Sequence, residues 1–493
     1  MNQSESSNIK KSLKVTSLFG GVQILSILIS IVRNKCVALL IGPLGIGLVE
    51  LYNSTIRLIK SLTDFSLHIS AVRDIAVAYE SGEVAKFKHT VSVFSKIVWF
   101  TGISGTLVCL LGSPLWSLFT FGDYNHFWAF ILLSCILLLN QLQSGKTVLL
   151  QGTQHYKYLA YSGIAGNVIG LITTVPIYFI WGIDGIIPVL IIASLTSLIM
   201  VYYYAGKINV SGYNLSFRQA MAEGRTMLKQ GFLLSINFLL STLVYYILRV
   251  FIGNKGGVEE LGLYSASFAI VTTYTGMIFQ SMGQEYYPRL STLSLDNEKM
   301  RNAVDNQILL SLLILGPLIA IFLTFSDYLL VLLYSSKFTN AGLMMAISMY
   351  GILYQVPSWC MSYTFLAKGD NRLFLIFETI AKIIKLLLEI GLYLSYGLTG
   401  LGVAFVLSYI YYTIQCAVVC KNKYGFLFSR SNLYLLMSYS CIGALLIYSY
   451  MLHTSFIRII IGSIVIVLAS AYSYYRLNKI INISEFITKK LHR

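Results

Sequence analysis

The sequence predicts an all-α, polytopic membrane protein with about fourteen transmembrane helices, arranged as two pseudo-symmetric six-helix lobes plus two C-terminal helices. Of its 493 residues, 56% are hydrophobic and only 11% are charged, whereas soluble domains carry about 25% charged residues. Apolar runs of about 20 residues, enough to cross a membrane core, recur along the whole chain. The runs are continuous, which is typical of helices rather than of a membrane barrel.

The first apolar run, from Val15 to Val32, ends at Arg33-Asn34-Lys35 without a small-residue cleavage site, so we expect a retained helix rather than a signal peptide. Thirteen further spans follow by hydropathy. The expected spans are 15–34, 48–72, 90–112, 127–150, 159–181, 185–206, 229–252, 262–287, 303–326, 341–366, 373–396, 398–420, 433–451 and 456–476.

The distribution of Lys and Arg sets the expected orientation. If the N-terminus is cytoplasmic, the cytoplasmic segments and the span ends next to them hold more than four times as many Lys and Arg residues as the segments on the other side of the membrane. Cytoplasmic loops of membrane proteins carry this excess. We therefore predict cytoplasmic N- and C-termini, and we attribute the net charge of +16 to these loops rather than to nucleic-acid binding.

The sequence offers no pattern for catalysis or for a metal. Its seven cysteines lie mostly in or beside apolar runs without paired spacing, which argues against a disulfide framework and against a metal site. The outward loops are short, and their acids and histidines are scattered. We predict no catalytic residues and no cofactor, and hence a protein that is not an enzyme.

Three matches suggest that the first twelve spans are two copies of six. Arg33 and Arg249 differ by 216 positions, as do Arg73 and Arg289, and the joints that begin at Gly182 and Gly397 differ by 215. Two such copies run in the same direction across the membrane, and transporters of this kind place their site between the lobes. The expected domains are an N-lobe at 1–206, a cytoplasmic linker at 207–228, a C-lobe at 229–420, and two further helices with a basic tail at 421–493.

Ionisable residues concentrate in the second span. Glu50, Arg57 and Asp64 recur every seven residues, and Lys60 lies four residues before Asp64. At 3.6 residues per turn these side chains share one side of the helix. Each costs about 2.5–3.5 kcal/mol to insert at the centre of a membrane, so this side is not expected to face lipid.

The eleventh span carries a second stripe. Glu378, Lys382, Lys385 and Glu389 follow at spacings of 4, 3 and 4 residues. This spacing allows Glu378 to pair with Lys382 and Lys385 with Glu389.

Two interpretations of these charges stay open. The first is that they are internal ion pairs that only lower the cost of insertion, with Arg33, Lys35 and Arg249 reaching outward from helix ends. The second is a hydrated cleft between the lobes with a net positive potential, which concentrates anions. In this second interpretation seven residues bind an anion such as pyrophosphate: Arg33, Lys35, Arg57, Lys60, Arg249, Lys382 and Lys385. Four acids provide ion coupling or charge balance: Glu50, Asp64, Glu378 and Glu389.

Three short motifs connect the chain to a known family. They are Gly42-Pro43-Leu44-Gly45-Ile46-Gly47-Leu48, the segment 118–122 (Leu-Phe-Thr-Phe-Gly), and the segment 333–338 (Leu-Tyr-Ser-Ser-Lys-Phe). Together with the length and span number, they resemble the Wzx-type flippases of lipid-linked oligosaccharides, which belong to the multidrug/oligosaccharidyl-lipid/polysaccharide exporter superfamily. The resemblance covers essentially the whole chain, although Glu50 is not part of the family pattern.

The resemblance implies a flippase of the bacterial inner membrane. Such a protein moves undecaprenyl-pyrophosphate-linked oligosaccharide repeat units, such as O-antigen units of lipopolysaccharide, from the cytoplasmic to the periplasmic leaflet by alternating access. It implies coupling to a proton or sodium gradient, partnership with a polymerase and a chain-length regulator of the same pathway, and a role for the last two helices in holding the lipid tail.

Two other functions are weighed against this one. A multidrug antiporter for organic cations would need an acidic cleft, whereas this cleft is expected to be basic. A membrane polysaccharide polymerase or ligase would need an outward acid–base constellation.

Overall fold

The computed structural model describes residues 3–208, 215–452 and 455–481, and in these ranges the regular structure is entirely helical. Within the same ranges, nine helical segments are long and apolar enough to cross a membrane. The all-helical fold and the multi-pass membrane character predicted from composition are confirmed.

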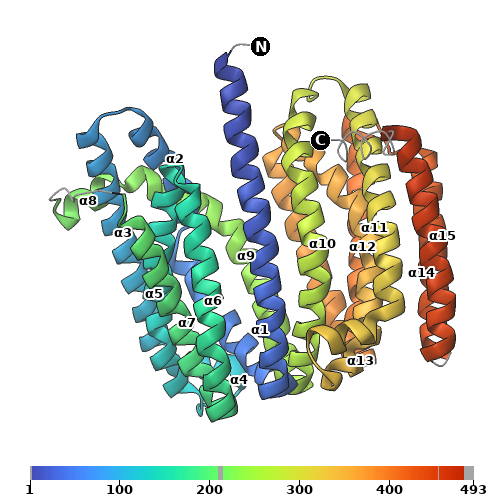
Figure 1. Ribbon diagram of the computed structural model, residues 1–493, viewed down its shortest axis with the longest axis horizontal. Coiled ribbons are helices and arrows are strands. Elements are labelled where there is room, and N and C mark those ends of the chain that lie inside the picture. Colours follow the sequence, from blue (N-terminus) through green and yellow to red (C-terminus); the bar gives the residue numbers. More distant parts are fainter. Residues whose placement is uncertain (1–2, 209–214, 453–454, 482–493) are drawn as a thin grey trace. The chain divides into compact units, whose positions relative to one another are not determined.

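The helices form two compact units, one up to Gly262 and one from Leu263 onward (Figure 1). This division reflects packing within each unit, and the lobe boundaries expected from the repeat stay a prediction. The first unit contains α1 (Gln3–Thr63), α2 (Leu67–Glu80), α3 (Val84–Leu111), α4 (Ser113–Phe121), α5 (Phe127–Gly152), α6 (Tyr156–Trp181), the 3-10 turn η1 (Gly182–Gly185), α7 (Ile186–Ala205), α8 (Phe217–Glu223), α9 (Arg225–Lys255) and the start of α10 (Val258–Thr292).

The second unit contains the rest of α10 and the remaining helices. These are α11 (Asn297–Leu333), the 3-10 segment η2 (Ser336–Ala341), α12 (Gly342–Ala367), α13 (Asn371–Tyr424), α14 (Arg430–Leu452) and α15 (Ser455–Ile481). Helices α14 and α15 pack against each other and against α11.

Two of the long helices each cover two expected spans: α13 contains both of its spans, and α1 contains 15–34 and most of 48–72. Helix α1 is interrupted at Gly42 (φ 62°, ψ −168°) and α13 at Gly397 (φ 58°, ψ −142°). Positive φ is readily available only to glycine, so these residues separate the spans that hydropathy predicted on either side. Pro43 then starts the second part of α1, where its missing amide hydrogen is not needed.

The positive-φ glycines follow the internal repeat. Gly182 ends α6 with φ 52° and ψ −127°, and Gly397, 215 positions later, has a similar conformation. Gly42 and Gly257 are also 215 positions apart, and both have positive φ. A glycine with positive φ therefore recurs at corresponding joints of the two copies.

The second expected span, 48–72, is not one continuous helix. Helix α1 ends at Thr63, and α2 begins at Leu67. Phe65 and Ser66 between them are left-handed, with φ of 50° and 46°, a conformation uncommon for residues other than glycine. The hydropathy of the segment gives no sign of this break, which places Asp64 at a helix end.

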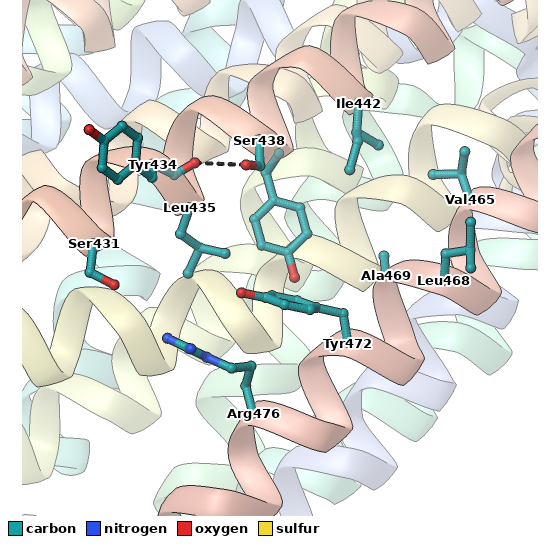
Figure 2. A pocket seen from close by; sticks show the side chains of 11 residues that line it. Ser431, Tyr434, Leu435, Ser438, Ile442, Val465, Leu468, Ala469, Tyr472 and Arg476 are labelled. Carbon is teal, nitrogen blue, oxygen red and sulfur yellow. Dashed lines mark hydrogen bonds between the residues drawn. The ribbon is translucent and has the colours of Figure 1, made fainter.

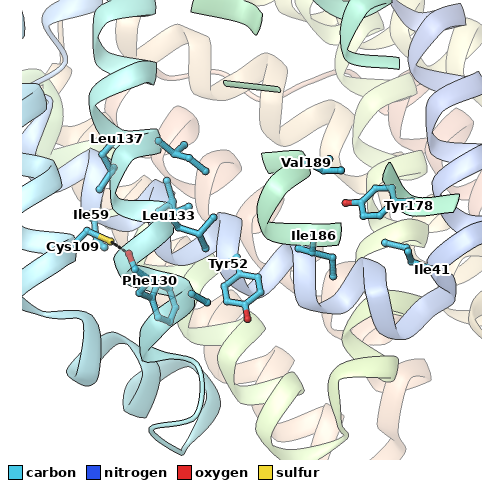
Figure 3. Close-up of a cluster of buried hydrophobic side chains, with 13 residues drawn as sticks. Ile41, Tyr52, Ile59, Cys109, Phe130, Leu133, Leu137, Tyr178, Ile186 and Val189 are labelled. Atoms are coloured by element: carbon cyan, nitrogen blue, oxygen red, sulfur yellow. Dashed lines mark hydrogen bonds between the residues drawn. The ribbon is translucent and has the colours of Figure 1, made fainter. Parts of the chain in front are cut away.

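Close packing in the first unit centres on the second part of α1. A buried cluster joins it to α5, α6 and α7, and includes Tyr52, Phe130, Leu133 and Tyr178 (Figure 3). Without a hydrophobic force between helices in lipid, such van der Waals packing and small residues hold the helices together.

The glycine motif of α1 packs directly against the start of α10. A Cβ on Gly47 would lie 1.9 Å from the carbonyl oxygen of Val258, and one on Gly262 would lie 1.9 Å from that of Pro43. Only glycine allows the two backbones to approach this closely, and this gives the motif its structural role.

Candidate anion site in the first unit

One carboxylate joins two arginines from different helices. Glu50 Oε1 accepts a hydrogen bond from Arg57 Nη2, two turns further along α1, and lies 2.5 Å from Arg249 Nε on α9. The Glu50 and Arg249 side chains are 19% and 14% exposed, whereas Arg57 is 53% exposed. The trio carries a net positive charge, and Arg57 is its most accessible member.

Hydroxyl groups hold α9 against α1 beside this trio. Thr55 contacts Thr120 at 3.0 Å between their hydroxyl oxygens, and Thr120 contacts the Tyr246 hydroxyl at 3.0 Å. All three are buried. Because Tyr246 lies one turn before Arg249, this chain of hydrogen bonds sets the position from which Arg249 reaches Glu50.

Asp64 lies in a separate polar cluster. Gln141 Nε2 donates to Asp64 Oδ1 at 2.9 Å and also to Thr101 Oγ1 at 2.8 Å, and His68 Nδ1 lies 3.4 Å from Asp64 Oδ2. Lys60 acts on this carboxylate electrostatically from one turn earlier. Asp64 is only 7% exposed, so its charge is satisfied by side chains of the first unit.

Arg33 and Lys35 are half-buried on the first part of α1. Arg33 interacts electrostatically with the buried phenol of Tyr178 on α6. The structure records no contact between Arg33 and the Glu50–Arg57–Arg249 trio among the described residues, so the repeat relation between Arg33 and Arg249 does not bring them onto a common partner.

The four charged residues expected in the eleventh span lie on α13 and form the two pairs that their spacing predicts. Lys382 Nζ lies 3.5 Å from Glu378 Oε2, and the Tyr412 hydroxyl donates to Glu378 Oε1 at 2.5 Å. Lys385 Nζ lies 3.8 Å from Glu389 Oε1.

The Lys385–Glu389 pair is enclosed. Glu389 is 2% exposed, and the Lys385 ammonium lies 5.4 Å from the ring centre of Phe268 and 5.0 Å from that of Phe405. Such cation–π contacts are worth about 2 kcal/mol when desolvated. The surroundings of the Lys385–Glu389 pair therefore match the first interpretation of these charges, an internal ion pair.

The excess of positive charge thus belongs to the first unit. Of the residues predicted from the sequence, that unit holds five cations (Arg33, Lys35, Arg57, Lys60 and Arg249) against two carboxylates, Glu50 and Asp64. In the second unit two lysines are balanced by two glutamates.

A cavity of about 490 Å³ lies between α14 and α15 (Figure 2). Its walls are mostly apolar, with Leu435, Ile442 and Leu468 among them, and Tyr472 and Arg476 line it on α15. Arg476 Nε is buried without a hydrogen-bond partner in the described structure. The volume is within the range of about 300–1,000 Å³ typical of small-molecule sites.

Sequence reasoning did not identify several of these partners. Gln141, Thr101 and Tyr412 are polar residues inside apolar spans, which is a usable signal, but their position around a particular acid depends on tertiary packing. Among the described residues, no group of three or more His, Cys, Asp or Glu is placed to hold a metal ion.

Comparisons with known proteins add a family to this geometry. The family model described as "Polysaccharide biosynthesis protein" matches residues 81–342, more than half of the chain. A putative O-antigen transporter of Shigella flexneri is 24% identical over 397 residues, which cover 77% of this chain and 92% of the relative. The lipid III flippase of Escherichia coli (strain K12) is 21% identical over 393 residues, 78% of this chain and 92% of the relative.

The fold is shared with a solved structure of the lipid II flippase MurJ in its inward-closed conformation. The two align with a TM-score of 0.67 at 14% identity, covering 93% of this chain and 99% of the other. The family match, which begins just after α2 and ends where α12 begins, spans most of the first unit and a third of the second. The chain therefore belongs to the polysaccharide biosynthesis protein family.

Proposed function

We propose that this protein is a flippase that translocates undecaprenyl-pyrophosphate-linked oligosaccharide repeat units from the cytoplasmic to the periplasmic leaflet by alternating access. The observation that carries the proposal is the Glu50–Arg57–Arg249 trio, in which two guanidiniums from different helices converge on one oxygen of an anion. Arginine is well suited to phosphate because its planar fork donates paired hydrogen bonds. The names of the relatives and the family membership support the same class of substrate.

Within this proposal, Arg57 and Arg249 contact the pyrophosphate. Arg33, Lys35 and Lys60 add to the positive potential of the first unit, and Lys382 and Lys385 contribute from α13. The first unit contributes most of the positive charge available to the cargo, because the lysines of α13 are already paired with Glu378 and Glu389. The transporter uses no catalytic group, since the cargo crosses the membrane chemically unchanged.

Coupling to a proton or sodium gradient is part of the proposal. Glu50 and Asp64 are the candidate acids, because Glu50 links Arg57 of α1 to Arg249 of α9 and Asp64 accepts a hydrogen bond from Gln141 of α5. An ion shifts the balance between inward- and outward-open states only by its difference in affinity for the two.

The apolar cavity between α14 and α15 offers space for part of the polyprenyl tail. We place the protein in the bacterial inner membrane with both termini in the cytoplasm, where it delivers its cargo to a polymerase and a chain-length regulator. Multidrug efflux is disfavoured because an organic cation would meet the excess of arginine and lysine in the first unit.

The triple variant Arg33→Ala/Arg57→Ala/Arg249→Ala tests the proposal in cells that lack the native protein. We expect export of surface polysaccharide to fall while the variant still inserts into the membrane at normal levels. Arg218→Ala, which removes an exposed arginine of α8 outside the spans, is the matched control and should leave export unchanged. Full export by the triple variant would contradict the proposal.

A further inference from the structure

The Glu50 carboxylate occupies the place between two guanidiniums that an oxygen of a phosphate would take. Both arginines contact the same oxygen, Oε1, and Glu50 comes from the same helix as Arg57. Any anion that binds both arginines must therefore displace this carboxylate or share them with it.

We propose that Glu50 is an internal competing anion that keeps singly charged lipid headgroups from occupying the arginine pair. This inference rests on the proposed function. A carboxylate carries one negative charge, as does the phosphodiester of a common anionic phospholipid. A lipid with one charge gains little by replacing Glu50, whereas the diphosphate group of a lipid-linked oligosaccharide brings two charges to the two arginines.

The burial of the trio supports this selection by charge. Glu50 and Arg249 are largely shielded from solvent, and ionic interactions in such places are screened less than at an exposed surface. Arg57, which is about half exposed, offers the first contact to an arriving anion. Specificity arises here by rejecting the wrong ligand, because phospholipids vastly outnumber the cargo in a membrane.

Glu50 also explains how binding remains reversible. Two arginines that met the diphosphate with no competing carboxylate would hold it more tightly in every state, which lowers turnover if release is slow. When the cargo leaves, Glu50 returns to the two guanidiniums.

A competition experiment on the purified protein in detergent tests this role. The probe is a fluorescent undecaprenyl-pyrophosphate-linked oligosaccharide, and the competitor is phosphatidylglycerol, which carries one charge. In Glu50→Gln we expect the affinity for phosphatidylglycerol, measured by displacement of the probe, to rise by at least about tenfold, equivalent to about 1.4 kcal/mol. Affinity for the probe should also rise, while its transport in vesicles slows.

Three variants make the result specific. Glu50→Asp keeps the charge and should keep the weak binding of phosphatidylglycerol, and Glu83→Gln removes an exposed carboxylate at the start of α3 and should do the same. Glu50→Ala should behave as Glu50→Gln does, and it replaces that variant if the glutamine form does not fold. An unchanged affinity for phosphatidylglycerol in the folded Gln or Ala variant overturns the inference.

The double variant Arg57→Gln/Arg249→Gln separates this inference from the proposed function. If it loses probe binding but Glu50→Gln binds phosphatidylglycerol only as weakly as the wild type does, only the role of Glu50 is wrong. If it binds the probe as well as the wild type does, the arginine site itself is wrong, and the role of Glu50 is overturned with it.

Discussion

At the scale of single residues, the charged groups of this protein differ in what surrounds them. Arg57 is about half exposed beside Glu50, whereas Lys385 is packed among aromatic rings beside a buried glutamate. The first arrangement leaves a cation accessible to a ligand. The second satisfies a cation within the fold, and we expect its contribution to appear in stability.

The Lys385–Glu389 pair provides a direct test of that difference. Lys385→Met leaves the Glu389 carboxylate buried without this partner, which should cost about 3–5 kcal/mol of stability. The double variant Lys385→Met/Glu389→Leu should recover most of the loss, because replacing both members of a buried pair by apolar residues is often nearly neutral. Thermal unfolding in detergent measures both. A double variant no more stable than the single one would show that the pair is not the cause.

His126 predicts a pH dependence of stability. It lies between α4 and α5, its Nδ1 lies 2.9 Å from the Tyr52 hydroxyl, and its ring stacks on Phe121. Burial lowers the pKa of His126 from its usual value near 6.5, with a smaller opposing effect of Asp123. The unfolded chain therefore binds the proton first as the pH falls.

The stability that neutral His126 contributes is complete above about pH 6.5 and is lost as the pH falls through the lower pKa of the folded state. The melting temperature should drop less between about pH 7.5 and about pH 5.5 in His126→Gln than in the wild type. Equal drops would contradict the assignment. The comparison isolates His126, because the other histidines are present in both proteins.

At the scale of helices, glycines determine how closely the elements approach. Gly47 on α1 and Gly262 on α10 each have a facing carbonyl oxygen where a Cβ would be placed. Gly47→Ala or Gly262→Ala should force the helices apart and cost about 1–3 kcal/mol. Gly170→Ala is the control, because a Cβ on Gly170 of α6 meets nothing within 4 Å. Unfolding in detergent should rank the two close-contact variants below the wild type, and equal stability of all three variants would contradict this account.

The sequence predicts the helices better than the contacts between them. Apart from 48–72, every expected span lies within a described helix to within one residue at each end, because a membrane core requires long apolar segments whose backbone hydrogen bonds are satisfied internally. The pairs Glu378–Lys382 and Lys385–Glu389 also follow from spacing alone, since residues four apart lie on one helix face. Hydropathy and helical spacing, which depend only on nearby residues, are therefore sufficient to predict both the helices and these ion pairs.

The contact between Glu50 and Arg249 does not follow from local rules. The two residues are 199 positions apart, and their meeting depends on how α9 packs on α1 through Thr55, Thr120 and Tyr246. The break at Phe65 and Ser66 is equally hidden, because neither residue type is typical of a left-handed backbone. Tertiary packing decides both features.

At the scale of the whole molecule, the expected orientation can be tested by labelling. Leu295, in the loop between α10 and α11, is fully exposed, and Tyr124, between α4 and α5, is 58% exposed. In a background with the seven native cysteines replaced, Leu295→Cys should react with a membrane-impermeant thiol reagent only from the cytoplasmic side. Tyr124→Cys should react only from the periplasmic side. The opposite pattern would reverse the orientation.

The central claim is that arginines of the first unit hold the diphosphate of a lipid-linked oligosaccharide while it crosses the membrane. The most direct measurement is translocation in liposomes that contain the purified protein, followed with a probe that detects the sugar in one leaflet only. The wild type should move the lipid, Glu83→Gln should equal it, and Arg57→Gln/Arg249→Gln should slow the movement by at least about tenfold, the effect of losing about 1.4 kcal/mol of interaction. A folded double variant that moves the lipid at the wild-type rate would contradict the claim.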